Sequence, residues 1–273
     1  MFLFNKIRNQ YAKISDGSPG TSCARNILSE SEGSDEEEPD LLYSELKCTD
    51  EEFDEETYEA LLMKPKRLEW MLSELRGFEN PDIKLEQYGT SPELAVAITD
   101  CIDRLVGLDG KFVGDLGCGY GMLMSAVALA YEPAAVIGFD IDKHAISTCK
   151  DNLEDLEIDG RCDLVRADVL ELPTSFRSDF DVILMNPPFG TKNNSGIDLC
   201  FVKAGLEMVR INGSVFSLHK TSTREYIFKT VNKWDDTEAE CVAQLRLELP
   251  ATYKFHKKKT VDIKVDLIHY RRV

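Results

Sequence analysis

The chain has 273 residues, of which 43% are hydrophobic, and it carries a formal net charge of −17 at pH 7. This much apolar sequence is enough for one sizeable core, while no apolar run approaches the ~18 residues of a membrane span and Met1 to Phe4 is too short for a signal peptide, so we expect an intracellular protein. The eight cysteines form no C-x-x-C pair, which favours reduced thiols over a disulfide framework or a metal site.

The first 62 residues differ from the rest in charge. They contain 16 acidic and 5 basic residues, which accounts for −11 of the net charge and leaves −6 for residues 63–273. Residues 29–40 and 50–56 are nearly continuous acidic tracts, and the segment shows little periodic hydrophobicity, as disordered segments do. We therefore expect a disordered acidic extension over residues 1–62 and one folded domain over residues 63–273.

The remainder alternates between two hydrophobic periodicities. Helical patterns cover residues 64–76, 92–105, 122–130, 144–156, 198–209 and 222–234. Apolar runs typical of strands cover residues 111–116, 136–140, 163–167, 180–185, 213–218, 239–247 and 261–270. Such alternation predicts an α/β fold with a doubly wound, mostly parallel, Rossmann-like sheet, in which the last two strands form an antiparallel hairpin. Ligands are expected at the carboxyl edge of that sheet.

A glycine-rich turn, Gly117-Cys118-Gly119-Tyr120-Gly121, follows the strand at 111–116. Glycines there let the backbone turn sharply and pass close to a ligand. The spacing G-x-G-x-G after Asp115 differs from the G-x-G-x-x-G of dinucleotide-binding folds, which argues against nicotinamide binding. Asp140 ends the next strand, where a carboxylate can accept hydrogen bonds from a ribose hydroxyl pair.

The tetrapeptide Asn186-Pro187-Pro188-Phe189 follows the strand at 180–185. The two prolines restrict the backbone, so that the Asn186 side-chain oxygen and the Pro187 carbonyl are held at one set position. Two such acceptors suit a planar amino group, whose hydrogens they bind so that the pyramidal, reactive form is favoured. Phe189 would stack on the ring that carries the amino group. We predict a catalytic role for these four residues.

A basic stretch with interleaved aromatic residues lies between the last two strands, at the same edge as the proline motif. Lysines there would contact phosphates and aromatic rings would offer stacking surfaces, which favours a nucleic-acid substrate. The residues predicted to contact RNA are Lys192, His219, Lys220, Lys254, Phe255, His256, Lys257, Lys258 and Lys259. For His219 and Lys220, at the end of a strand, a capping role is equally consistent with the sequence.

The run from Asp115 to Gly121 resembles motif I of the class I methyltransferases that use S-adenosylmethionine. This resemblance implies the strand order 3-2-1-4-5-7-6. It also implies that an acid at the end of the third strand, Asp168, accepts a hydrogen bond from the adenine amino group of the cofactor.

A longer resemblance covers the chain from about Met63 to the C-terminus. It is to the eukaryotic methyltransferase-like enzymes that modify N6 of an adenosine in small-subunit ribosomal RNA. It rests on residues 85–88, 115–121, 138–142, 186–194, 217–220 and 253–259. The cofactor contacts that it implies are Gln87, Thr90, Asp115, Gly117, Gly119, Tyr120, Met122, Asp140, Asp168 and Val169. The chain departs from the family pattern at Tyr120 and at Gly89, where proline is expected.

The same resemblance implies a cofactor, a partner and a location. The cofactor is S-adenosyl-L-methionine, and no metal is expected. The partner is the small zinc-binding activator subunit that forms heterodimers with several methyltransferases by extending their sheet, here at the strand edge near residues 162–167. The location is the nucleus and the cytoplasm.

Three alternatives stay open at this level. The proline motif also occurs in enzymes that methylate guanine N2 and in enzymes that methylate the glutamine amide nitrogen of release factors, because both substrates present planar nitrogens. The basic stretch and Phe189 favour RNA. A methyltransferase fold kept only as a binding scaffold is the third alternative, and it would predict damaged motifs, which this sequence lacks.

Overall fold

The computed structural model describes residues 64–172, 176, 179–190, 194–250 and 260–272. The acidic extension expected over residues 1–62, Lys192 and the basic stretch 253–259 lie outside these residues. Within the described part, no helix combines the length and the apolar character needed to cross a membrane.

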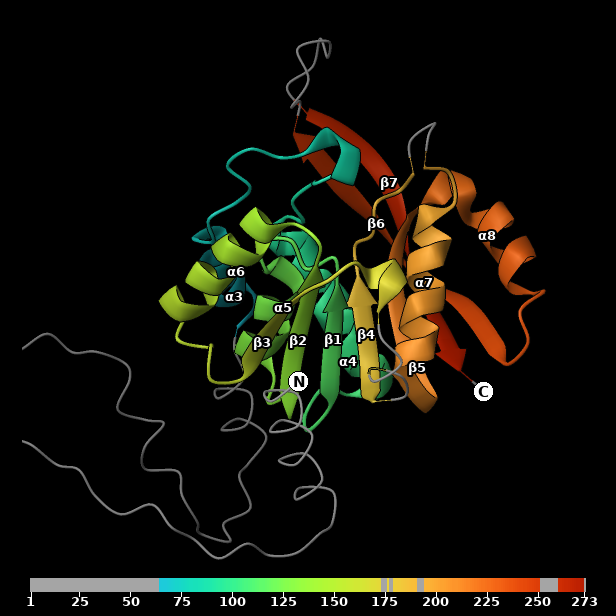
Figure 1. Cartoon of the computed structure of the whole chain (residues 1–273), viewed down its shortest axis with the longest axis horizontal. Helices are drawn as coiled ribbons and strands as arrows, with labels where there is room; N and C mark the ends of the chain where they lie inside the picture. Colours follow the sequence, from blue (N-terminus) through green and yellow to red (C-terminus); the bar gives the residue numbers. More distant parts are fainter. Residues whose placement is uncertain (1–63, 173–175, 177–178, 191–193, 251–259, 273) are drawn as a thin grey trace, which may run out of the picture. The chain divides into compact units, whose positions relative to one another are not determined.

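The core of the folded part is one seven-stranded sheet (Figure 1). In spatial order its strands are β3 (Cys162–Arg166), β2 (Ala135–Asp140), β1 (Phe112–Leu116), β4 (Phe180–Met185), β5 (Val209–Lys220), β7 (Thr260–Arg272) and β6 (Thr237–Pro250). The first five are parallel, and β7 pairs antiparallel with both β5 and β6. The predicted order and the C-terminal hairpin are therefore confirmed.

The helices begin where the sequence supplies capping groups. They are α3 (Pro65–Ser73), α4 (Pro92–Val106), α5 (Met122–Ala130), α6 (Lys143–Asp155), α7 (Ile197–Met208) and α8 (Arg224–Val231), with short 3-10 turns η2 (Ile83–Leu85), η3 (Val169–Glu171) and η5 (Thr221–Thr223). Ser91 caps α4 by accepting from the Leu94 N–H, with Pro92 in the first turn. Asp142 caps α6 by accepting from the His144 N–H.

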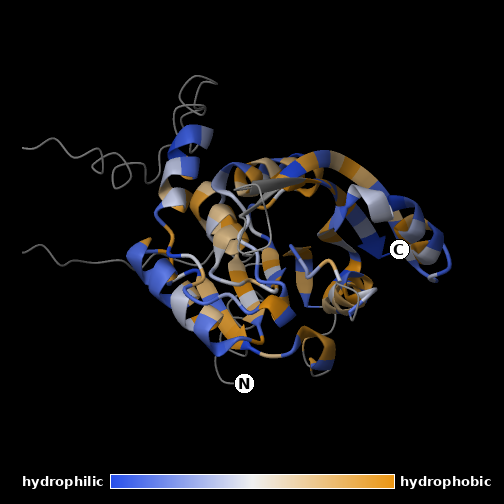
Figure 2. Ribbon diagram, turned by 90° about the horizontal axis from the view of Figure 1, so that it is seen from above, coloured by the Kyte–Doolittle hydropathy of each residue, from blue (hydrophilic) through white to orange (hydrophobic). Residues whose placement is uncertain are grey.

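The sheet is covered on both faces because its strand residues alternate between two cores. Val182 and Leu184 of β4 belong to the cluster that packs against α4 and α5. Ile183 and Met185 point to the other face, where they pack on Gly205 of α7. In Figure 1 α7 lies in front of β4 and β5 while α4 lies behind, and in Figure 2 the apolar residues gather between these layers.

Most element boundaries differ from the prediction by a few residues, and two of these differences have a visible cause. The helix expected over residues 64–76 ends at Ser73, because the Arg76 N–H donates to the Asn152 side chain and not to a helical carbonyl. The strand expected over residues 213–218 starts already at Val209. Its first part contains Asn212 in the left-handed region, at φ 63°, so its side chains do not follow the regular alternation that makes a strand recognisable.

Candidate active site

A cavity of about 1060 Å³, its mouth included, lies at the carboxyl edge of the parallel strands. It is lined by residues that follow β1, β2, β3 and β4, and by residues 84–90, which precede α4. The carboxyl edge of a doubly wound sheet is where ligands bind in such folds.

The floor of the cavity is the turn between β1 and α5. Gly119 has φ 57°, and a Cβ there would lie 2.9 Å from the ring of Phe78. Gly121 has φ 96°, and a Cβ there would lie 2.6 Å from the sulfur of Cys149. Both positions require glycine, because a side chain would be strained by the backbone conformation and would also collide with a packed neighbour.

Asp140, at the end of β2, is tied to this turn. Its carboxylate accepts from the Gly119 N–H at 2.9 Å and from the Asp142 N–H at 2.8 Å. Burial raises its pKa. Next to it the Gln87 amide donates to Asp142 at 2.8 Å. Burial opposes a low pKa at Asp142, but this hydrogen bond and those from backbone N–H groups hold its pKa below the ordinary value.

Asp115, the last but one residue of β1, is a buried carboxyl that faces the cavity. One oxygen accepts from the Met124 N–H at 3.1 Å, and the other has no hydrogen-bond partner among the described residues. Burial, helped by the nearby charge of Asp140, raises the pKa of Asp115 to about 8. An unpaired buried acceptor of this kind favours a ligand that brings a cationic hydrogen-bond donor.

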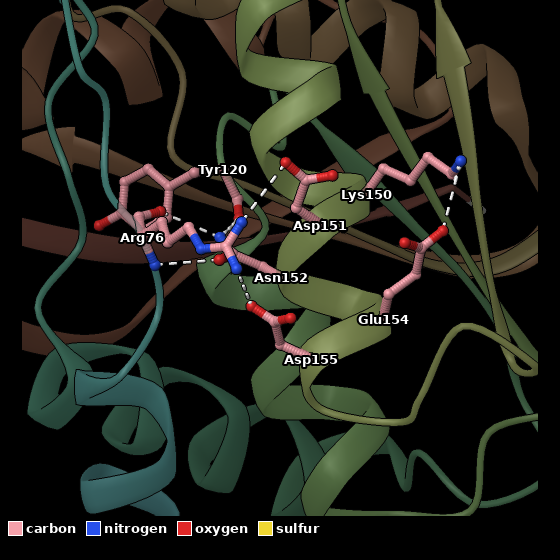
Figure 3. A network of polar contacts seen from close by, with 7 residues as sticks. All are labelled: Arg76, Tyr120, Lys150, Asp151, Asn152, Glu154 and Asp155. Carbon is pink, nitrogen blue, oxygen red and sulfur yellow. Dashed lines mark hydrogen bonds and ion pairs between the residues drawn. The ribbon is translucent and has the colours of Figure 1, made fainter.

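Asn152 of α6 connects the glycine turn, at Tyr120, to the segment after α3, at Arg76. Its amide donates to the carbonyls of Arg76 at 3.0 Å and Tyr120 at 2.9 Å, and its oxygen accepts from the Arg76 N–H at 2.9 Å (Figure 3). The side chain is 1% exposed. The Arg76 guanidinium also pairs with Asp151 and Asp155, but these groups are exposed and such pairs contribute little.

Tyr120 holds the segment before α4 against the turn. Its ring packs edge-on against Phe78, with 5.0 Å between ring centroids, and its hydroxyl donates to the Thr90 carbonyl at 3.3 Å. Burial raises the pKa of Tyr120 to about 12, so the hydroxyl stays protonated and remains a donor.

The proline motif follows β4 on the opposite wall. Asn186 and Pro188 line the cavity, whereas Pro187 is buried and is not part of the lining, so acceptance by its carbonyl stays a prediction. The Asn186 amide nitrogen donates to the Thr90 hydroxyl at 3.1 Å. No described residue donates to its side-chain oxygen, so this acceptor remains for a ligand.

Phe189 lies outside the cavity lining. Its ring is 8% exposed and belongs to the core cluster, and the Lys220 ammonium lies 5.4 Å from the ring centroid. A cation at this distance from an aromatic face is attracted to it. Stacking of Phe189 on a substrate ring stays a prediction, and in this structure Lys220 is its neighbour.

Comparison with known proteins gives this site a family. Residues 99–232 match the methyltransferase small domain. The chain is 56% identical over 212 residues to the rRNA N(6)-adenosine-methyltransferase metl-5 of Caenorhabditis elegans, a match that covers 77% of this chain and 99% of the relative. It is 45% identical over 209 residues to METTL5 of Danio rerio, which bears the same description, with 76% of this chain and 99% of the relative covered. This chain belongs to the rRNA N(6)-adenosine-methyltransferase family.

The fold of this methyltransferase agrees with that of a solved relative. The crystal structure of a putative RNA methyltransferase from Pyrococcus horikoshii superposes on this chain with a TM-score of 0.65. The two sequences are 30% identical, and the match covers 78% of this chain and all of the other. The resemblance stated from the motifs is thereby confirmed at the level of family and fold.

All ten residues predicted to bind cofactor line this same cavity of the methyltransferase. They are Gln87, Thr90, Asp115, Gly117, Gly119, Tyr120, Met122, Asp140, Asp168 and Val169. Asp168 also caps η3 by accepting from the Leu170 N–H at 2.9 Å, so one of its oxygens already has a partner. Contact of these residues with a cofactor stays a prediction.

The predicted RNA contact of His219 does not agree with the structure. Its side chain is fully buried, with one ring nitrogen 2.9 Å from Asp198 and the other 3.0 Å from the Tyr270 hydroxyl. The sequence places His219 at a strand end beside a lysine, which resembles an exposed position. β7 covers it, however, and this burial depends on the pairing of a strand some fifty residues further along the chain.

Sequence reasoning missed several residues of the cavity. Phe78, Ile141, Leu170, Ile197 and Phe201 supply apolar wall, and Asn152 braces the turn from behind. For Ile141 and Leu170 a signal exists in the sequence, since Ile141 directly follows the predicted Asp140 and Leu170 directly follows the predicted Val169. Both are apolar residues left exposed, at 46% and 45%. Asn152 gives no local signal. Among the described residues, no group of three or more metal-ligating side chains occurs, and the six cysteines are free.

Proposed function

We propose that this chain transfers a methyl group from S-adenosylmethionine to N6 of an adenosine in small-subunit ribosomal RNA. The relatives in C. elegans and D. rerio are described as rRNA N(6)-adenosine-methyltransferases, and this chain covers 99% of each. The observation that carries the proposal is the position of Asn186. Asn186 lines the cavity at the end of β4, and its side-chain oxygen accepts nothing from a described residue.

The residues of the cavity fit the proposed cofactor. The unpaired oxygen of Asp115 suits the ammonium of its amino-acid portion, and Asp140 lies where a ribose is expected in such sheets. Ile141 and Leu170 offer apolar surface beside Asp168 for a base. When bound, S-adenosylmethionine supplies an electrophilic methyl group on a cationic sulfur.

The chain's own residues bind and orient the reacting amino group. The Asn186 oxygen and the Pro187 carbonyl accept its two hydrogens, which favours the pyramidal nitrogen and directs its lone pair. No general base is required for attack, because the proton is lost from a cationic product. The rate therefore depends mainly on holding the reacting atoms about 3 to 3.5 Å apart. An adenosine within a helix cannot reach this position, so the base must leave its stack.

We also propose the small zinc-binding activator as a partner, in a heterodimer formed at the β3 edge. Within the described residues β3 pairs only with β2. At the two ends of β3, the Ala167 N–H donates to the Asp140 carbonyl of β2, and the Arg161 carbonyl accepts from the Val136 N–H of β2. In a parallel pair every second residue bonds to the neighbouring strand, so Leu164 and Arg166, which alternate with these residues, direct their backbone groups away from β2. An edge of this kind accepts an added strand.

One substitution tests this edge. Arg166→Pro removes an outward N–H while leaving the β2 ladder intact, and Arg166→Ala is the matched control because the side chain is exposed. The partner should co-purify with the wild type and with Arg166→Ala but not with Arg166→Pro. Equal recovery with all three would contradict pairing at β3. For location, we propose the nucleus and the cytoplasm, which imaging of the tagged chain would test.

The experiment that tests the function uses the full chain with the activator, labelled S-adenosylmethionine and unmodified small-subunit ribosomal RNA. After digestion to nucleosides, label in N6-methyladenosine that is lost in Asn186→Ala supports the proposal. Label in N2-methylguanosine, label on protein glutamine, or no transfer despite cofactor binding would each replace it with one of the alternatives.

A further inference from the structure

Thr90 occupies an unusual place in this site. It was predicted as a cofactor contact, yet its hydroxyl accepts a hydrogen bond from the Asn186 amide at 3.1 Å. The side chain is 6% exposed, so water does not compete freely for this bond. Thr90 precedes α4 and Asn186 follows β4, and the 96 residues between them mean that only the folded chain brings them together.

This bond bears on the orientation of the asparagine side-chain amide, which has two possibilities. An amide is planar with an acceptor at one end and a donor at the other, and its last torsion has two broad, nearly equivalent minima. If the NH2 group faced the substrate, a donor would oppose the donor hydrogens of the adenosine amino group. Only the orientation with the oxygen in the cavity allows acceptance from that amino group.

We infer that Thr90 is a positioning residue: its hydroxyl, which can bond either end of an amide, accepts from the Asn186 NH2 group and so satisfies that group in the orientation in which the Asn186 oxygen accepts from the substrate. This inference rests on the proposed function. It differs from a cofactor-contact role because it predicts an effect on the transfer step and not on cofactor affinity.

Thr90 is itself held in place from the cofactor turn. The Tyr120 hydroxyl donates to the Thr90 carbonyl at 3.3 Å, and Tyr120 lies between two glycines of that turn. A chain of two hydrogen bonds thus runs from the turn through Thr90 to Asn186. A change in the turn can reach the catalytic amide by this route.

The test compares three variants of the full chain. Thr90→Val keeps the shape and removes the hydroxyl, and Thr90→Ser restores it. Thr99→Val removes another buried threonine hydroxyl, one that bonds to carbonyls of its own helix and to Tyr131, outside the cavity lining. We expect kcat to fall about tenfold in Thr90→Val, as for loss of one ordering hydrogen bond, and to recover in Thr90→Ser. The KM for S-adenosylmethionine should change less than about twofold in all three.

A spectroscopic readout keeps the inference testable without turnover. The two side-chain amide protons of Asn186, identified by their loss in Asn186→Ala, should give separate signals in the wild type, and the hydrogen-bonded one should shift in Thr90→Val only. Wild-type protons that exchange with water equally fast would overturn the inference. So would an unchanged kcat with a raised dissociation constant for S-adenosylhomocysteine in Thr90→Val, which is the result for a simple cofactor contact. If the wild type itself fails to methylate adenosine, it is the proposed function that fails.

Discussion

A Cβ atom at Gly89 would lie 2.5 Å from the hydroxyl oxygen of Tyr120. These are the two positions at which the sequence is expected to depart from the pattern of its family, and a side chain at position 89 would meet Tyr120. The absence of a side chain at position 89 makes room for the tyrosine hydroxyl, which then bonds to the Thr90 carbonyl. The packing at position 89 and the hydrogen bond of Tyr120 therefore depend on each other.

The first prediction concerns this pair. Gly89→Ala should displace the buried Tyr120 hydroxyl and destabilise the protein by about 1 to 3 kcal/mol. Tyr120→Phe removes the hydroxyl and should cost about 1 kcal/mol. In the double variant the new Cβ meets only ring carbons at ordinary distance, so its loss should be smaller than the sum of the two single losses.

Urea unfolding of the four proteins measures this coupling. Gly77→Ala is the control, since a Cβ at Gly77 meets no atom within 4 Å. Additive losses from Gly89→Ala and Tyr120→Phe would show that the two residues do not interact.

The second prediction concerns Asn152. Asn152→Ala removes three hydrogen bonds of a buried side chain and leaves two carbonyls and one N–H unpaired, which should lower the free energy of unfolding by about 2 to 4 kcal/mol. Because Asn152 joins Arg76 to Tyr120, affinity for S-adenosylhomocysteine should fall as well. Asn232→Ala, at an exposed asparagine, should change neither quantity by a measurable amount.

Denaturation and calorimetry together decide this prediction. If Asn152→Ala is destabilised but binds S-adenosylhomocysteine as tightly as the wild type, the hydrogen bonds of Asn152 to Arg76 and Tyr120 do not affect ligand binding.

The site residues that lie at the ends of strands can be predicted, because each belongs to a short sequence motif. A glycine turn, an acid after β2 and a proline motif after β4 each carry a local signal, and parallel strands bring their carboxyl ends to one edge. Asn152 and the bond between Thr90 and Asn186 were not predictable, because each depends on a contact between residues 32 to 96 positions apart. His219 was misjudged for the same reason, since only β7 buries it.

The third prediction follows from that correction. His219→Ala should lower stability by about 2 to 4 kcal/mol, because it leaves one carboxylate oxygen of Asp198 and the Tyr270 hydroxyl unpaired in a buried site. Tyr270→Phe should cost less, about 1 kcal/mol, because it removes one partner of the same network. The salt dependence of RNA binding should be unchanged in both, since no phosphate contact is lost. A shallower salt slope for folded His219→Ala would restore an RNA role.

The fourth prediction concerns the pH dependence of stability. Burial raises the pKa of Asp115 from its ordinary value of 3.8 to about 8, so the folded chain keeps a proton that the unfolded chain releases. The contribution of Asp115 to stability is thus full below the lower value and is lost as pH rises through the upper one. Asp115→Asn removes it.

Urea unfolding from about pH 4 to pH 8 should therefore show the wild type losing stability relative to Asp115→Asn. Asp159→Asn, at an exposed carboxyl, should follow the wild type. A constant difference between wild type and Asp115→Asn across the range would contradict a raised pKa at Asp115.

The central claim is that the Asn186 oxygen binds the amino group that receives the methyl. The most direct measurement is single-turnover methyl transfer to ribosomal RNA by Asn186→Ala, with the dissociation constant for S-adenosylhomocysteine measured on the same preparation. We predict unchanged ligand affinity and a transfer rate at least about 100-fold lower than that of the wild type. Transfer to N6 of adenosine at the wild-type rate by Asn186→Ala would contradict the claim.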